Sequence, residues 1–402
     1  MPTLSDVEQD AVNRAQAEPM LDQVRAWSAI NSGSRNLPGL ERVAGALADA
    51  FSVLPGELTL EDATDVEQVS ENGATFTLDH GRNLHLAVRP DAPVQLLFTG
   101  HMDTVFGADH AFQDLQWLED GVLNGPGVAD MKGGLAVMLA ALKAVEAVPG
   151  ADRIGYEVVV NSDEEVGSPG SAALLARASR GKRAALTYEP SALPDGTLAG
   201  ARPGSGNFSI VVNGRSAHAG RNPEDGRNAL LAAADLALRF DQLRRDGLSV
   251  NPARIDGGSP NNVVPDKAVL RVNLRPRTPE LQADAEEAIA AIVAAVAAER
   301  DVTIHAHGGF GRPPKPMTDD MLKLFELVKQ AGADLGQPIG WKATGGVCDG
   351  NNIAACGVPV IDTMGVRGGK IHSMEEFLIS ESLGERAALS ALTILRIAEG
   401  RL

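Results

Sequence analysis

Hydrophobic and polar positions along the chain follow two periods, one typical of buried strands and one typical of helices. Short apolar runs that end in polar residues predict strands at residues 94–99, 156–161 and 184–188. Apolar residues at helical spacing predict helices at 132–148 and 171–179, between these strands. This alternation predicts an α/β fold with a mainly parallel sheet and helices on both of its faces.

The pattern changes near residue 203 and resumes after residue 314. In this block, strands are expected at 207–213, 267–274 and 302–307, and helices at 228–245 and 279–300. The block contains 13 basic and 13 acidic residues, so the net charge of −17 lies entirely outside it. We therefore predict one α/β domain made of residues 1–202 and 315–402, interrupted by a smaller α+β domain at 203–314. A helix at 318–330, a strand at 358–363 and a terminal helix at 380–399 complete the larger domain.

Composition and charge narrow the range of functions. The 402 residues are 44% hydrophobic, which is enough for the cores of two domains. The 53 acidic residues outnumber the 36 basic ones, and such a surface repels nucleic acid and anionic membranes. The longest apolar segment, residues 288–298, is shorter than the ~20 residues that cross a bilayer. Because no secretory signal is seen and only Cys348 and Cys356 are present, we expect a cytoplasmic protein without disulfides.

Five side chains stand just past apolar strands or in glycine-rich loops, where polar groups can point into a cleft. They are His101, Asp130, Glu165, Glu189 and His372. Two imidazoles and three carboxylates suit Zn²⁺ or a similar metal, and five ligands suit two ions about 3.5–4 Å apart if one carboxylate bridges them. Each residue alone has an ordinary alternative, since a single histidine is more often hydrogen-bonded and a Glu-Glu turn is more often solvated surface.

The local sequences around these residues resemble, in the same order, the M20 family of metallopeptidases and amidohydrolases. The motifs are Thr-Gly-His-Met-Asp at 99–103, Gly-Pro-Gly-Val-Ala-Asp-Met-Lys-Gly-Gly at 125–134, Ser-Asp-Glu-Glu-Val-Gly at 162–167, Tyr-Glu-Pro at 188–190 and Lys-Ile-His-Ser at 370–373. The resemblance spans residues 94–375 and is nearest to the glutamate carboxypeptidase type. It extends to acetylornithine deacetylase and succinyl-diaminopimelate desuccinylase types.

The resemblance implies a fold and a metal centre. The block at 203–314 would be a ferredoxin-like lid and dimerisation domain inserted into the catalytic domain. Asp130 would bridge two divalent ions, with His101 and Glu189 completing one site and Glu165 and His372 completing the other. The ions would be Zn²⁺, with Co²⁺ and Mn²⁺ as alternatives. The peptide bond between Asp130 and Met131 would be cis.

The resemblance also implies three catalytic roles. Glu164 would be the general base that acts on a metal-bridging hydroxide or its parent water. Asp103 would orient the imidazole of His101, although a turn-capping role suits this aspartate equally well. His218, in Gly-Arg-Ser-Ala-His-Ala-Gly at 214–220, would hold the scissile carbonyl oxygen, often in the cleft of the other subunit of a homodimer.

Substrate contacts are expected at Asn262, Arg275 and Gly346, with a surface hydrogen bond as the alternative for the first two. The glutamate carboxypeptidase type has an arginine just before its Thr-Gly-Gly run, but this chain has Ala343 there. This departure argues against strict specificity for a C-terminal glutamate. Arg367 could supply the missing positive charge. Cys348, which has no evident base nearby, is expected to line the cleft rather than to act as a nucleophile.

The function that follows is hydrolysis of an amide or peptide bond in a small N-acyl amino acid or dipeptide-like substrate. Two other functions stay open at this stage. The same site could hydrolyse a different bond, as in deamination, or the chain could be a catalytically silent protein that binds metal or peptide. All five candidate ligand residues and Glu164 are present, which argues against a protein without catalytic activity.

Overall fold

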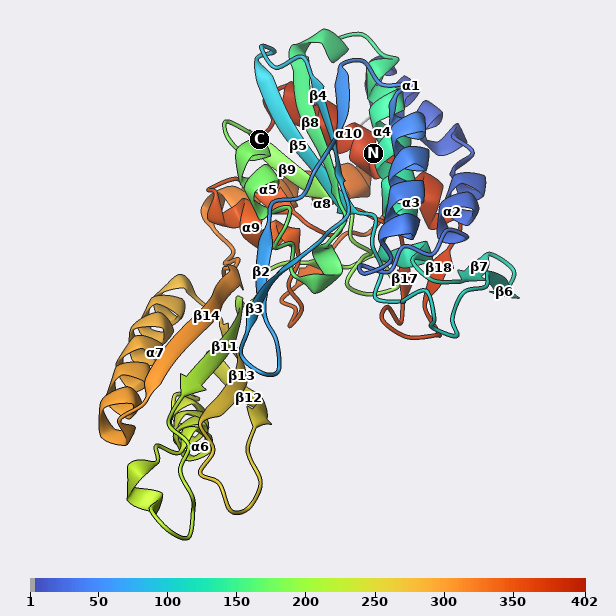
Figure 1. The fold of residues 1–402 in the computed structure, drawn as a ribbon. Helices are drawn as coiled ribbons and strands as arrows, with labels where there is room; N and C mark the ends of the chain where they lie inside the picture. The colour runs from blue at the N-terminus through green and yellow to red at the C-terminus, as the bar shows by residue number, and fades with distance from the viewer. Residues whose placement is uncertain (1–3) are drawn as a thin grey trace.

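The computed structural model describes residues 4–402 and divides them between a large and a small unit (Figure 1). The large unit contains a six-stranded sheet in the order β1-β4-β8-β5-β9-β16. Strands β8, β5, β9 and β16 are parallel, β4 pairs antiparallel with β8, and the edge strand β1 pairs antiparallel with β4. The bounds are β1 Glu57–Glu61, β4 Asn83–Val88, β5 Val94–His101, β8 Ile154–Asn161, β9 Ala184–Thr187 and β16 Val360–Ile361.

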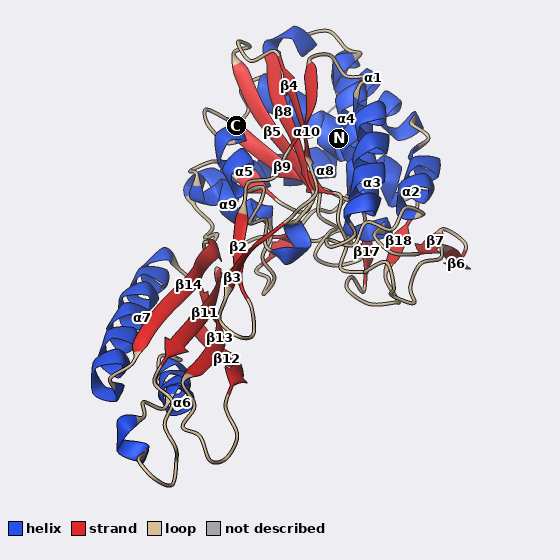
Figure 2. Cartoon of the chain, in the orientation of Figure 1, coloured by secondary structure: helices blue, strands red, loops and turns tan. Residues whose placement is uncertain are grey.

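Helices cover this sheet, as Figure 2 shows in blue. They are α1 Asp6–Ala17, α2 Met20–Ser28, α3 Leu37–Phe51, α4 Gly133–Glu146, α5 Ala172–Ala178, α8 Asp319–Asp334, α9 Asp349–Ala355 and α10 Ser382–Ala398. Strand β5 is buried from Leu96 to His101, on both of its alternating faces. A strand buried on both faces requires layers on both sides of the sheet. The predicted α/β class with a mainly parallel sheet is therefore confirmed.

The small unit has its own antiparallel sheet, in the order β12-β13-β11-β14. Its elements are β11 Ser205–Asn213, α6 Ala229–Asp241, β12 Leu248–Gly257, β13 Lys267–Pro276, α7 Pro279–Arg300 and β14 Thr303–Arg312. This βαββαβ order is ferredoxin-like. Both helices pack on one face, where Ile210, Leu236, Leu270 and Ile289 belong to a separate core. The domain boundaries at 203 and 314 stay a prediction.

The sequence-based expectation for the small unit was wrong in one element, because it had no strand between α6 and β13. Strand β12 is an edge strand that pairs only with β13 among the described residues, and its burial falls off after Val250. Its register shifts between Pro252 and Arg254. An edge strand with a proline and charged side chains lacks the apolar alternation by which strands are recognised.

Short elements complete the large unit. They are the small sheet of β6 Gln116–Glu119, β7 Val122–Asn124, β17 Gly368–Gly369 and β18 Phe377–Ile379, the pair β10 Leu198–Ala199 and β15 Trp341–Lys342, and the single turns η1 Val128–Lys132, η2 Ala151–Arg153 and η3 Glu164–Val166. A further turn, η4 Pro223–Asp225, belongs to the small unit. Within residues 4–402, no helix has the length and apolar character to pass through a membrane. Cys348 and Cys356 are both free.

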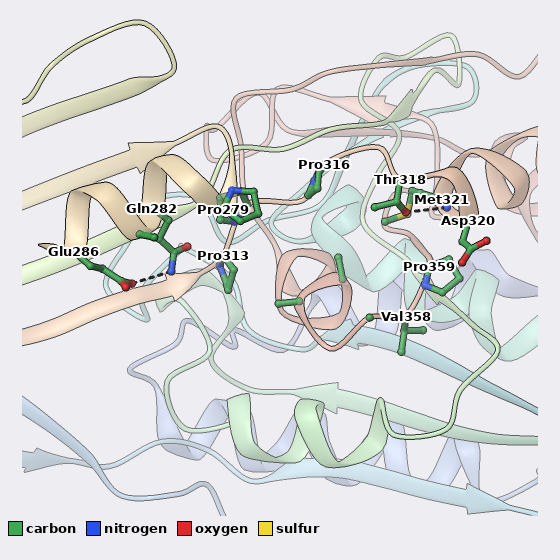
Figure 3. Close-up of a pocket in the computed structure, with 15 residues that line it drawn as sticks. Pro279, Gln282, Glu286, Pro313, Pro316, Thr318, Asp320, Met321, Val358 and Pro359 are labelled. Atoms are coloured by element: carbon green, nitrogen blue, oxygen red, sulfur yellow. Dashed lines mark hydrogen bonds between the residues drawn. The ribbon is translucent and has the colours of Figure 1, made fainter.

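The chain enters and leaves the small unit side by side. The backbone N–H groups of Arg202 and Lys315 each donate to the other residue's carbonyl oxygen, both at 3.0 Å. One buried carboxylate, Asp362, binds both side chains, at 2.7 Å from Arg202 Nε and 2.7 Å from Lys315 Nζ. Beside this crossing, the linker prolines and the first turns of α7 and α8 line a cavity of about 560 Å³ (Figure 3).

A hairpin of the large unit also reaches the small one (Figure 1). It consists of β2 Val66–Val69 and β3 Thr75–Leu78. Arg271 of β13 donates through Nη2 to the carbonyl oxygens of Val69 at 2.7 Å and Ser70 at 3.0 Å. Val69 packs with Val211 and Val269 on the sheet face opposite the helices. Three separate segments therefore connect the two units.

We expect Asp362→Asn to lower the free energy of unfolding by about 3 kcal/mol, because removing one partner of a buried ion pair leaves the others uncompensated. Burial opposes ionisation of Asp362, but Arg202 and Lys315 outweigh it and lower the pKa to about 2. The stabilisation is therefore complete above about pH 4 and is lost as the pH falls through about 2. Urea denaturation across this range measures it.

Asp320→Asn is the matched control, because Asp320 forms an exposed ion pair with Lys323 one helical turn away. Such exposed pairs contribute about 0–1 kcal/mol. An equal fall in the free energy of unfolding in the two variants would contradict the stabilising role of Asp362.

Candidate metal centre

The five predicted ligand residues converge at the carboxyl ends of the parallel strands. His101 is the last residue of β5, Glu165 lies in η3 just after β8, and Glu189 follows β9. Asp130 lies in η1 ahead of α4, and His372 comes from the loop between β17 and β18. Functional groups in open α/β sheets gather at this edge, because each strand there passes into a loop.

Asp130 lies between the two histidines. Its Oδ1 is 3.1 Å from Nε2 of His101, and its Oδ2 is 3.3 Å from Nε2 of His372. Oε2 of Glu189 is 3.7 Å from Nε2 of His101, and Oε2 of Glu165 is 3.1 Å from Nε2 of His372. Ligand atoms around a tetrahedral Zn²⁺ with bonds near 2.0–2.1 Å lie roughly 3.3 Å apart. The donor set therefore fits two divalent cations that share one carboxylate.

Asp103 makes both contacts that the sequence left open. Nδ1 of His101 is 3.1 Å from the backbone carbonyl oxygen of Asp103 and 3.3 Å from its Oδ1, and both contacts orient the ring. The two carboxylate oxygens of Asp103 also accept the backbone N–H groups of Glu164 at 3.1 Å and Glu165 at 3.2 Å, and Ser34 Oγ donates at 2.7 Å. One buried carboxylate thus fixes a ligand histidine and the turn that carries two more acidic residues.

A second buried carboxylate, Glu376, holds the loop of Asp130. It accepts the backbone N–H groups of Gly127 at 3.2 Å, Ala129 at 3.0 Å and Asp130 at 3.0 Å. The peptide bond between Asp130 and Met131 is cis, as the resemblance implies. Past this loop, Gly134 lies so close to the neighbouring strand end that a Cβ atom there would be 1.9 Å from the carbonyl oxygen of Tyr188.

The centre holds more negative than positive charge in a poorly solvated space. Burial raises the pKa of Glu164 to about 8, of Glu165 to about 7 and of Glu189 to about 8, and the charge of Asp130 adds to the last two shifts. For Asp130, burial opposes ionisation, but hydrogen bonds from His101 and His372 outweigh it and hold the pKa below its usual range. Divalent cations would offset this clustered negative charge.

A cavity of about 590 Å³ opens onto the centre. Asp130, Glu165, Glu189 and His372 line it together with Gly346 and Cys348, so Cys348 lies where the sequence predicts a cleft. Burial holds the pKa of this thiol well above its ordinary value, which keeps it protonated and suits a lining role. A neighbouring cavity of about 920 Å³ is lined by Glu164, His372, Arg275 and residues of β14.

Other predicted residues lie apart from the centre. His218 and Asn262 belong to adjoining loops of the small unit, where the N–H of Ala219 donates to the carbonyl oxygen of Asn262 at 2.9 Å. The loop of His218 follows the end of β11 that points away from the large unit (Figure 1). Arg367 binds Glu385 at 3.0 Å and Glu381 at 3.4 Å and lines neither cavity. Its proposed contact with substrate stays a prediction.

The sequence analysis did not identify two residues that contact the residues of this centre. Arg312, the last residue of β14, binds Glu164, and Glu376 holds the loop of Asp130. A glutamate four positions after His372 gives no local signal. Arg312 ends a glycine-rich strand and reaches Glu164 from 148 positions away. Only tertiary structure shows either contact.

Comparison with known proteins identifies the class. The model of peptidase family M20/M25/M40 matches residues 97–396, so the chain belongs to this family, and the predicted membership is confirmed. The chain is accordingly a hydrolase of the metallopeptidase and amidohydrolase type.

Individual relatives agree with this class. Carboxypeptidase G2 of Pseudomonas sp. is 29% identical over 330 residues, which cover 80% of this chain and 78% of that enzyme. Succinyl-diaminopimelate desuccinylase of Afipia carboxidovorans is 34% identical over 269 residues, covering 60% of this chain and 67% of that enzyme. The crystal structure of aminopeptidase PepT from Bacillus cereus has a TM-score of 0.69 at 21% identity, covering 96% and 99% of the two chains, and shows the same fold.

For the metal-free protein we expect the free energy of unfolding to fall as the pH rises from about 5 to 8. Unfolded glutamates titrate near 4.3, whereas Glu164, Glu165 and Glu189 have pKa values of about 7 to 8 in the fold. Across this interval the folded state therefore binds more protons than the unfolded state. Hydrogen bonds to Asp130 and Glu165 raise the pKa of His372 to about 11, which acts in the same direction.

Urea denaturation of the chelator-treated protein at several pH values tests this. The control is the same series with added Zn²⁺, which should stabilise the fold more at pH 8 than at pH 5. Metal-free stability that rises with pH over this range would contradict the arrangement described.

Proposed function

We propose that the protein is a dinuclear metal-dependent amide hydrolase. Its substrate would be a small N-acyl amino acid or a dipeptide-like molecule. The observation that carries the proposal is Asp130, whose two oxygens each face a different histidine, with Glu189 beside one and Glu165 beside the other. The ions we propose are Zn²⁺, with Co²⁺ and Mn²⁺ as alternatives.

The bound ions would acidify a water molecule and polarise the scissile carbonyl group. The task of Glu164 is to accept the proton of that water at its carboxylate and to deliver it to the leaving amine. Its pKa of about 8 in the metal-free protein suits a group that must exchange protons near neutral pH. Asp103 supports this task because it holds the backbone of Glu164 at 3.1 Å.

A carboxylate on the substrate would bind Arg275. This arginine lines the cavity beside Glu164, and its hydrogen bonds go to the neutral acceptors Asn273 Oδ1 at 3.1 Å and the carbonyl oxygen of Gly345 at 3.3 Å. The names of two relatives, a carboxypeptidase and a succinyl-diaminopimelate desuccinylase, agree with a substrate of this kind. Ala343 stands where the glutamate carboxypeptidase type has arginine, so we do not propose strict specificity for a terminal glutamate.

We further propose a homodimer formed through the small unit, with His218 and Asn262 of each copy serving the other copy's cleft. The loop of His218 lies far from its own centre, and Leu231 and Leu238 are 55% and 68% exposed on one face of α6. Apolar side chains so exposed on a helix suit a protein partner. Free Cys348 and Cys356 are consistent with our proposal of a cytoplasmic location.

Glu164→Ala should keep both metal ions and lose turnover by about 10²-fold or more, the usual effect of losing a general base. Wild type and variant, loaded with Zn²⁺ or Co²⁺, are incubated with a panel of N-acyl amino acids and dipeptides, and products are followed by mass spectrometry. Exposed Glu41→Gln is the control. Full turnover in Glu164→Ala would reject the proposed function, and so would the absence of turnover by wild type on every amide in the panel. Release of ammonia as the only product would indicate deamination instead.

Activity should return when two inactive proteins are mixed. The Glu164→Ala chain keeps His218, and the His218→Ala chain keeps Glu164, so a hybrid dimer contains one complete site. After mild denaturation and joint refolding, we expect up to about a quarter of wild-type turnover per chain. Each variant refolded alone is the control. If the mixture stays as inactive as its components while sedimentation shows dimers, His218 does not act across the interface.

A further inference from the structure

Arg312 is a buried arginine at the point where the chain leaves the small unit. Only 4% of its side chain is exposed, although it ends β14, a strand of the small sheet. Nη2 donates to Oε1 of Glu164 at 2.8 Å, to Oγ of Ser168 at 3.0 Å and to the carbonyl oxygen of Glu164 at 3.3 Å. Nη1 donates to Asp349 and, at 2.8 Å, to Asn352.

The far side of this guanidinium is itself fixed. Asp349, which binds Nη1, also accepts hydrogen bonds from Asn161 Nδ2 at 2.6 Å and Ser168 Oγ at 2.6 Å. Asn161 is the last residue of β8, so the contact is anchored to the central sheet. A guanidinium whose Nη1 and Nη2 are both hydrogen-bonded has few orientations left, and Glu164 therefore meets a rigid donor.

Glu164 also lies within reach of the metal centre. A carboxylate oxygen of Glu164 and ligand atoms of His101 and Glu189 all lie within 4.8 Å of one another. A free carboxylate at that distance would be attracted to a divalent cation and would become one more ligand. A carboxylate that binds the metal directly has lost the lone pair with which a base accepts a proton.

We propose that Arg312 is the positioning residue of Glu164, which it holds on its guanidinium and so keeps out of the metal ligand set. The inference rests on the proposed function and adds to it the reason why one of two adjacent glutamates, Glu164, stays a base while Glu165 faces His372. Because Arg312 belongs to β14, the small unit takes part in placing the base of its own subunit.

The test compares Arg312→Met and Arg312→Lys with wild type. In Arg312→Met, we expect kcat to fall by about 10²-fold with little change in KM, since a misplaced catalytic group costs about that much. Zn²⁺ affinity, measured by chelator competition, should be unchanged or higher. The visible absorption of the Co²⁺-loaded protein should weaken, because a carboxylate has joined the ligands. Lysine, which can hold one oxygen, should restore part of kcat.

Arg396→Met is the matched control. Arg396 is also buried, at 5% exposure, and also binds two carboxylates, Glu8 at 2.9 Å and Asp334 at 2.7 Å. It should lower the unfolding temperature as Arg312→Met does, while kcat and the Co²⁺ spectrum stay as in wild type. If Arg312→Met lowered kcat only by destabilising the fold, Arg396→Met would lower kcat to the same extent. That result would overturn the proposal.

A double variant separates this proposal from the proposed function. In a Glu164→Ala background, Arg312→Met should change neither the residual kcat nor the Co²⁺ spectrum, because no carboxylate is left to move. A spectral change that persists there means that Arg312 acts on the ligands by another route, and the proposal fails. If Glu164→Ala alone keeps full turnover, the proposed function fails. If it loses turnover while Arg312→Met does not, only the positioning role fails.

Discussion

The burial of several carboxylates around two imidazoles is the constraint on which the rest of this structure depends. Asp130, Glu164, Glu165 and Glu189 lie together in a space from which water is largely excluded, and their mutual repulsion has to be offset. His101 and the proposed cations supply positive charge on one side. Arg312 supplies it on the other, where it binds Glu164 at 2.8 Å. Under the proposed function, the direction in which each carboxylate faces would decide whether it binds a metal ion or accepts a proton.

Hydrogen bonds from backbone N–H groups hold the loops that present these carboxylates. Asp103 accepts the N–H groups of the turn that presents Glu164 and Glu165, and Glu376 accepts those of the loop that presents Asp130. Both are buried carboxylates that bind the main chain, and Asp103 also contacts the imidazole of His101. Hydrogen bonds from amides to a charged acceptor are among the stronger ones in proteins, so the two loops are held rigidly. The side chains that we propose as ligands are therefore carried by loops that these hydrogen bonds hold in place.

The sequence was sufficient to predict a helix, a strand or a candidate site residue where the signal is local. Helix α7 begins at Pro279 after a capping threonine and ends at Arg300, and the prediction matched both ends because cap and apolar spacing agree. The five proposed ligand residues could be recognised as candidates because each ends a strand or lies in a short motif, and their assignment as ligands stays a prediction. Strand β12 was missed because its proline and charged side chains obscure the alternation, and the four short strands near His372 were missed because two to four residues are too few to show a period. Contacts between distant segments, such as Arg312 with Glu164, have no local pattern at all.

The charges of the cleft also bear on which substrate group it can receive. Arg202 lines the cavity but is neutralised by Asp362 at 2.7 Å, and Arg367 is neutralised by Glu385 at 3.0 Å. Among residues 4–402, Arg275 instead donates only to neutral acceptors, Asn273 at 3.1 Å and the carbonyl oxygen of Gly345 at 3.3 Å. An arginine without a carboxylate partner keeps its capacity for a bidentate bond to an anionic group. Since Ala343 offers no charge, the proposed binding of a substrate carboxylate by Arg275 would involve the small unit, and the position of that unit would then contribute to specificity.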